Sequence, residues 1–157
     1  MGKAIHTGRF MAKPGEDIVV FIIGMRINKW WAVHKWLPVF LAMPGMIQEL
    51  YRNQQLGFLS MESMMGVRTT MMVQYWKSVE HLEAYAKGQT HLKAWGNFYA
   101  KVGNNSAVGI YHETYVITPG TYECFYGNMP LFGLAQAIGQ QEVSSKHQTA
   151  KQRIAST

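Results

Sequence analysis

The chain has 157 residues, a length that fits one ordinary domain with a real hydrophobic core and is too short for two independent ones. Apolar residues make up 48% of the sequence and charged residues only 15%, which excludes a disordered, highly charged chain. The formal net charge of +6 gives no nucleic-acid signal, because residues 1–16 and 139–157 each carry three bases against one acid and the remaining bases are scattered.

The first half of the chain predicts one strand, a helical region and a hairpin. Residues 17–27 (DIVVFIIGMRI) are β-branched and apolar and predict a strand buried on both faces. Residues 30–53 have apolar positions at helical spacing, but their two prolines predict two or three helical pieces instead of one rod. Residues 56–66 and 68–76 predict a β-hairpin, in which successive side chains point to opposite faces.

Two short helices and a last strand follow. Ser78 is predicted to cap the first helix, which ends at Gly88, and Thr90 to cap the second, which Gly103 ends. Residues 107–117 predict a strand that Pro119 stops. The order strand, helix, strand, strand, helix, strand predicts an α+β, ferredoxin-like split βαβ domain with helices on one face of the sheet.

The other sheet face would be apolar and open, so we expect a homodimer in which a second copy covers it. Residues 1–16 are interpreted as an N-terminal arm, 17–138 as the ferredoxin-like domain, and 139–157 as a flexible C-terminal tail. The N-terminus lacks the apolar segment of a secretory signal, and the longest uncharged stretch, residues 124–141, would make a poor membrane span. With one cysteine and hence no intrachain disulfide, the expected location is the cytoplasm, with no membrane partner.

Four longer strings carry a more specific signal: VVFIIGMRINKWW with WLPVFLAMPGMIQEL, VQYWKSVEHLEAYA, HLKAWGNFYAKVG and VGIYHETYVITPGTYECFYGNMPLFGLA. Over residues 17–138 they resemble the uncharacterised monooxygenase-like family that includes the fumagillin-pathway polyketide monooxygenase of fungi. That family lies within the dimeric α+β barrel superfamily, beside the antibiotic-biosynthesis monooxygenases and, more remotely, haem-containing aldoxime dehydratases. The resemblance implies a dimeric α+β barrel with a cavity between sheet and helices, but no single chemistry.

The resemblance does not extend to the haem-degrading branch of that superfamily. Those enzymes have a tryptophan and a histidine about ten residues apart across the second helix. Here Tyr85 and Trp95 stand near those places. We therefore do not expect an enzyme of haem breakdown.

Two histidines are the candidate catalytic residues. His112 alternates with apolar residues in the last strand, so it faces either the cavity or the dimer interface. It is interpreted either as a hydrogen-bonded core residue or as a general base or haem axial ligand. His91 stands at the start of the second short helix and is either a surface residue or a base or ligand. Arg26 and Asn28, at the end of the first strand, are the candidate contacts to an oxyanion.

Aromatic and methionine side chains are the candidate substrate contacts. The chain has 11 methionines and 5 tryptophans, which either fill an irregular core or line an adaptable pocket for a flat ligand. The residues predicted to bind substrate are Trp76, Trp95, Tyr75, Met72 and Met129. The apolar segment that contains Met129, residues 122–135, is expected to close the cavity or to cross to the partner subunit.

The favoured function is a small monooxygenase-like enzyme that acts on an apolar or aromatic small molecule and requires no cofactor. One alternative is a haem-binding enzyme of the same fold, with dehydratase or peroxidase-like activity and His112 or His91 as axial ligand. Another is a non-catalytic small-molecule-binding dimer. Phosphate loops, dinucleotide fingerprints and nucleophile elbows are absent from the sequence, which disfavours standard NAD, FAD and ATP enzymes.

Overall fold

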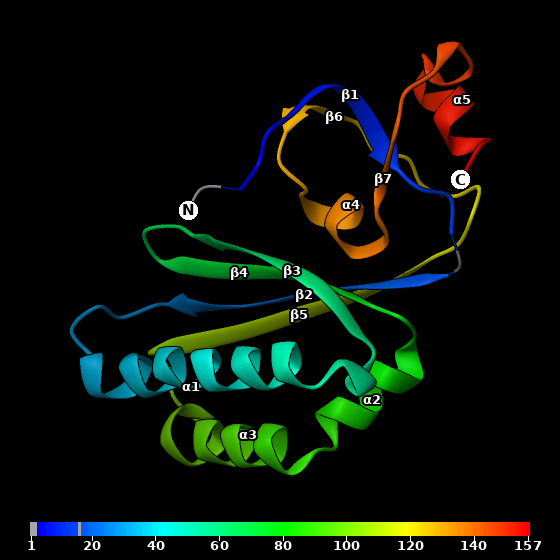
Figure 1. Cartoon of the computed structure of the whole chain (residues 1–157). Helices are drawn as coiled ribbons and strands as arrows, with labels where there is room; N and C mark the ends of the chain where they lie inside the picture. Colours follow the sequence, from blue (N-terminus) through cyan, green and yellow to red (C-terminus); the bar gives the residue numbers. More distant parts are fainter. Residues whose placement is uncertain (1–2, 16) are drawn as a thin grey trace.

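In the computed structural model, which describes residues 3–15 and 17–157, three helices cover one face of a four-stranded antiparallel sheet (Figure 1). The elements of this layer pair are β2 (Ile18–Ile27), α1 (Val33–Arg52), the 3-10 turn η1 (Gln54–Leu56), β3 (Phe58–Met65), β4 (Thr69–Trp76), α2 (Val79–Ala86), α3 (Gln89–Val102) and β5 (Val108–Ile117). The strand order is β3-β4-β2-β5. The split βαβ order and the single helical layer confirm the predicted ferredoxin-like α+β fold.

The register of the central strand decides which side chains face the helices. Phe21 of β2 lies opposite Gln74 of β4 and Thr114 of β5, and the next residue on that face lies opposite Met72 and His112. Because side chains alternate along a strand, this set shares the helix-facing side of the sheet. The apolar clusters between sheet and helices contain fully buried Trp76.

Helix α1 is continuous over 20 residues, so the predicted division into two or three pieces is wrong. Pro38 and Pro44 lie inside it, and each removes one backbone donor. Residues before, between and after these prolines, namely Trp36, Phe40 and Leu50, pack in the clusters between α1 and the same sheet. Packing along the whole helix therefore holds together a segment that proline alone would divide.

The two short helices begin close to their predicted positions. The Ser78 side chain accepts a hydrogen bond from the backbone N–H of His81, which confirms the predicted cap of α2. Helix α3 instead begins at Gln89 with Gly88 as its N-cap. The Thr90 hydroxyl, predicted to cap that helix, donates to Glu49 Oε1 at 3.1 Å and so joins α3 to α1.

Both terminal segments form regular structure on the opposite side of the main sheet (Figure 1). Their elements are β1 (His6–Ala12), β6 (Tyr126–Met129), α4 (Gly133–Ile138), β7 (Gln140–Glu142), the 3-10 turn η2 (Ser145–His147) and α5 (Ala150–Ile154). Strands pair in the order β6-β1-β7. Residues 139–157, predicted as a flexible tail, are tied down by Arg153, whose Nε donates to Glu123 Oε2 at 2.7 Å.

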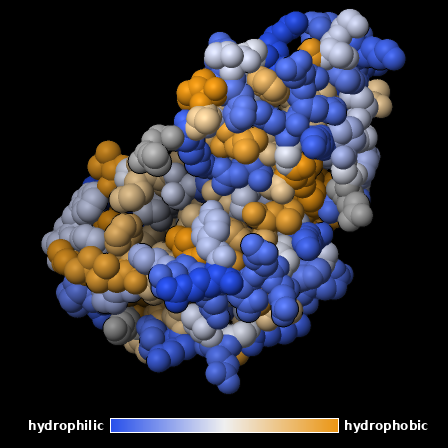
Figure 2. Space-filling view, in the orientation of Figure 1, coloured by the Kyte–Doolittle hydropathy of each residue, from blue (hydrophilic) through white to orange (hydrophobic). Residues whose placement is uncertain are grey.

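Helix α4 packs on the face of the main sheet that lies away from α1 to α3. Leu134 and Ala135 are buried there, and the Gly133 N–H donates to the Glu62 carboxylate at 3.1 Å. The segment predicted as a lid or crossing arm thus covers the opposite sheet face in its own chain. Figure 2 shows apolar side chains gathered along the band between these terminal elements and the main sheet. Among the described residues, no helix is long and apolar enough to span a membrane.

Candidate functional site

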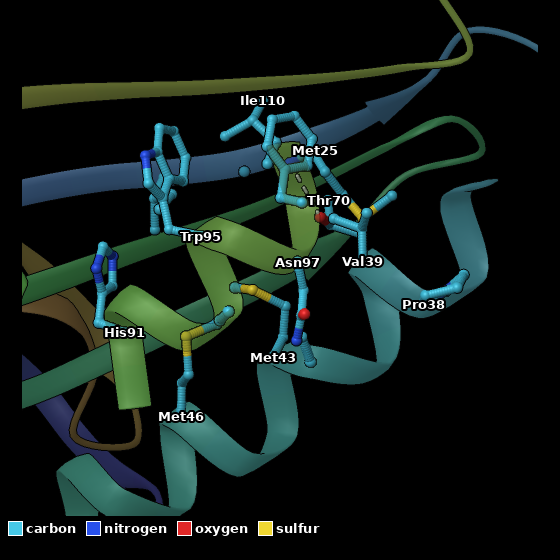
Figure 3. A pocket seen from close by; sticks show the side chains of 15 residues that line it. Met25, Pro38, Val39, Met43, Met46, Thr70, His91, Trp95, Asn97 and Ile110 are labelled. Carbon is cyan, nitrogen blue, oxygen red and sulfur yellow. Dashed lines mark hydrogen bonds between the residues drawn. The ribbon is translucent and has the colours of Figure 1, made fainter. Parts of the chain in front are cut away.

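An apolar cavity lies between the main sheet and helices α1 and α3. It has two adjacent parts of about 130 Å³ and about 290 Å³ that share several wall residues. The shared residues are Ile23, Met43, Met46, His91, Trp95 and Ile110. In Figure 3, Met43 and Met46 extend from α1 toward α3, while Ile110 closes the cavity from the sheet side. The lining suits an apolar ligand, because flexible thioethers adapt to its outline.

His91 brings an imidazole to both parts of the cavity. It lies in the first turn of α3, one turn before Trp95, and the two side chains lie side by side in Figure 3. Their rings are stacked with centroids 6.4 Å apart, and the Tyr85 ring meets His91 edge-on at 5.8 Å. Within the described part of the chain, the buried Nδ1 of His91 has no hydrogen-bond partner. No protein group therefore competes for the proton that this nitrogen can bind.

His112 lines the larger part of the cavity from the edge strand β5. It is exposed, and its ring lies 5.7 Å from that of Phe21. Of the two orientations that the sequence left open, the structure therefore has the one toward the helices. The two candidate histidines stand on opposite walls, His91 on the helical side and His112 on the sheet side.

Two polar residues that line the larger part of the cavity, Gln74 on β4 and Tyr85 on α2, were missed by the sequence reasoning. Gln74 is only 6% exposed, and its Oε1 accepts a hydrogen bond from Trp76 Nε1 at 3.0 Å. Tyr85 is 9% exposed, and its buried hydroxyl has no partner among the described residues. Burial and, to a lesser extent, the nearby Glu49 carboxylate raise the pKa of Tyr85 to about 12, so the hydroxyl keeps its proton at neutral pH. The sequence signal that could have identified Gln74 is its position two residues before Trp76, which places both side chains on one face of the strand.

Of the predicted substrate contacts, the structure brings Trp95 and Met72 to the cavity wall. Trp76 lies behind the wall, with no exposed surface. Tyr75 packs on the other face of the sheet in the cluster that contains α4, and Met129 belongs to β6. Neither of these two residues lines the cavity.

The two predicted oxyanion contacts also lie elsewhere. Arg26 is exposed near the end of β2, where its guanidinium donates to the Thr69 hydroxyl at 3.4 Å. Asn28 follows that strand, and its backbone N–H donates to Ala107 O at 2.9 Å. Neither Arg26 nor Asn28 lines the cavity, so any donor to a substrate oxygen must come from other residues.

The side chains that could ligate a metal restrict which cofactors the cavity could hold. No group of three or more His, Cys, Asp or Glu side chains suited to a metal ion occurs among the described residues. Haem iron needs only one or two protein ligands and an apolar slot for the ring. His112, exposed on an apolar wall, fits that requirement.

The split βαβ sheet with its cavity places the protein in a fold class that includes aldoxime dehydratases. The chain superposes over 88% of its length on 41% of the chain of the aldoxime dehydratase OxdRE, solved with butyraldoxime, with a TM-score of 0.69 and 16% identity. A second aldoxime dehydratase structure gives a TM-score of 0.68 at 18% identity, over 88% of this chain and 42% of that one. Residues 18–134 match the Monooxygenase af470-like family, and the chain belongs to that family.

The sequence is also similar to a curated fungal protein. Monooxygenase af470 of Aspergillus fumigatus is 31% identical over an alignment of 127 positions that covers 74% of this chain. The chain spans 45% of the length of that relative.

Proposed function

We propose that the protein is a small monooxygenase-like enzyme that acts on an apolar or aromatic small molecule in the cavity between sheet and helices, without a cofactor. The observation that carries the proposal is the unpartnered, buried Nδ1 of His91 in a cavity with Met and Trp walls. A base enclosed by apolar groups can take a proton from a weak carbon acid while bulk water is kept away. Membership in the Monooxygenase af470-like family supports the reaction class.

The chemistry that this site supports uses the substrate as its own electron source. A CH₂ group beside a carbonyl loses a proton to His91, and the resulting enolate passes electrons to O₂. In balance, the CH₂ group and O₂ give a carbonyl and one water: the carbon loses two hydrogens, one oxygen atom stays with it, and the other is reduced to water. His112, on the opposite wall, is the second candidate base.

A second candidate function is haem binding through His112. It is favoured by the exposed imidazole on an apolar wall and by the shared fold with aldoxime dehydratases. Bound haem would supply iron chemistry of a dehydratase or peroxidase-like kind. His112 would hold the iron, and Phe21 would pack beside the imidazole.

Oxygen uptake with anthrone, a flat carbon acid, tests the first candidate. We expect His91→Gln to lower the rate by about 10²- to 10⁴-fold, the range for loss of a general base. The matched control is His34→Gln, because His34 is exposed on α1 and lies outside the cavity. Full activity in both His91→Gln and His112→Gln would contradict the proposal.

Addition of hemin tests the haem candidate. A Soret band that appears on adding hemin and is lost in His112→Ala would support ligation by that residue, while no spectral change in the unaltered protein would exclude it. Ligand binding with no oxygen uptake from any bound carbon acid would favour the non-catalytic alternative.

A further inference from the structure

The hydrogen bond between Gln74 and Trp76 fixes the direction of a buried amide. An indole N–H can only donate, so the atom at 3.0 Å from Trp76 Nε1 must be the carbonyl oxygen of Gln74. The Nε2 of Gln74 consequently points away from Trp76, and neither of its N–H groups has a partner among the described residues. Gln74 is buried and lines the larger part of the cavity. This amide is therefore a donor held ready for a bound molecule.

Tyr85 also lines this part of the cavity. Its ring lies 5.5 Å from that of Trp76, so Trp76 supports both polar side chains. The Tyr85 hydroxyl is buried without a partner, an arrangement that destabilises the folded protein. Unpaired buried groups are uncommon in folded proteins, and an acceptor on a bound molecule would satisfy this one.

We infer that Gln74 Nε2 and the Tyr85 hydroxyl donate hydrogen bonds to one oxygen of the substrate, and that this oxygen belongs to a neutral aromatic ketone. No Lys or Arg lines these two parts of the cavity, so the carboxylate of an acidic ligand would enter without a counter-charge. The nearby Glu49 carboxylate further disfavours a negatively charged ligand. A ketone, by contrast, offers acceptor lone pairs without a charge.

This inference rests on the proposed function and gives the two donors a role in it. When a base removes a proton beside the ketone, negative charge develops on the ketone oxygen, and hydrogen bonds to that oxygen strengthen. Tyr85 also contacts His91, the proposed base, with ring centroids 5.8 Å apart. The base and the donors therefore act on neighbouring atoms of one substrate. Trp76 is a positioning residue, because it orients Gln74 and does not line the cavity.

The test compares two ligands of nearly equal shape, fluorene and 9-fluorenone, which differ by a carbonyl oxygen. Equilibrium dialysis of the intact protein should show that 9-fluorenone binds about ten-fold more tightly, the contribution of roughly one to two net hydrogen bonds. Tyr85→Phe should reduce that preference by about five-fold. It should also leave the urea midpoint unchanged or raise it, because the variant removes an unsatisfied buried hydroxyl.

Tyr122→Phe is the matched control. The Tyr122 hydroxyl is likewise buried without a described partner, but this residue packs in the cluster with α4 and lies outside the cavity. Tyr122→Phe should therefore keep the full preference for 9-fluorenone.

Four results would overturn the inference: no binding of either ligand, equal binding of both, an unaltered preference in Tyr85→Phe, or a lower urea midpoint in that variant. Tighter binding of 9-fluorenol than of 9-fluorenone would also contradict it, because the site would then act as an acceptor. A ketone preference without any oxygen uptake from anthrone would remove the proposed reaction and leave the donor pair in place.

Discussion

Trp76 is expected to support both the fold and the cavity wall, and the double variant Trp76→Phe with Gln74→Leu tests this directly. Trp76 has no exposed surface, and its ring packs against Phe58 and Tyr85 at 5.5 Å each. Its indole N–H donates to the Gln74 side chain, which is 6% exposed. Each single variant therefore leaves one buried polar group without its partner, whereas the double variant removes both groups.

The magnitudes follow from these contacts. Trp76→Phe removes three ring atoms, which costs about 1–2 kcal/mol of apolar burial. It also leaves Gln74 Oε1 unpaired, for about 1–3 kcal/mol more, so we expect a total loss of about 2–5 kcal/mol. Gln74→Leu leaves the indole N–H unpaired and should cost about 1–3 kcal/mol. In the double variant only the apolar loss remains, so it should be about 2–6 kcal/mol more stable than the sum of the single effects predicts.

The assay is urea unfolding followed by far-ultraviolet circular dichroism, which does not depend on the fluorescence of the remaining tryptophans. At an ordinary m-value, Trp76→Phe should move the midpoint down by about 1–2 M. The m-values should be unchanged, since a changed slope would report a different unfolded or native state. Effects that add to within about 0.5 kcal/mol would show that the two residues are not coupled, and the amide orientation deduced from their hydrogen bond would then be refuted.

Two further predictions concern the parts of the chain outside the cavity. Arg153→Met removes the ion pair with Glu123 and two hydrogen bonds to backbone carbonyls, so amide hydrogen exchange in residues 139–157 should become at least about ten-fold faster while β2 keeps its protection. Equal protection in the variant and the unaltered protein would contradict this prediction. The control is Lys151→Met, because Lys151 is exposed. On the sheet face beside α4, the side chains of Tyr115 and Met64 are still 50% and 53% exposed. Because a second copy could cover these apolar side chains, light scattering should show a homodimer. A stable monomer at micromolar concentration would refute that expectation.

The fold was largely predictable because local patterns determine its main elements. The β-branched run of β2, the hairpin of β3 and β4, and the Ser78 cap all have short-range causes. The features that were not predicted depend on tertiary contacts. Pro38 and Pro44 do not divide α1, since the sheet packs along its whole length, and the terminal strands pair only through contacts with residues more than 100 positions away.

The candidate site was only partly predictable, because alternation along a strand gives the face of a side chain and not its depth. The hairpin pattern correctly placed Tyr75 and Trp76 on opposite faces, yet neither residue lines the cavity. Tyr75 lies under α4, whose position depends on contacts between distant segments. Trp76 lies on the helix side, but at the end of the strand where Leu82 and Tyr85 close over it.

The same alternation explains why a glutamine becomes the fixed polar group of the cavity. Gln74 and Trp76 are two residues apart on one strand face, so their side chains are neighbours on the wall between sheet and helices. A buried tryptophan requires an acceptor for its N–H, and a glutamine that supplies the acceptor must turn its two donors away from the tryptophan. Gln74 also lines the larger part of the cavity, so the proposed site takes these donors to face the substrate space. A requirement of core packing thus directs hydrogen-bond donors toward the substrate space, which is why a variant that disturbs Trp76 should change ligand preference as well as stability.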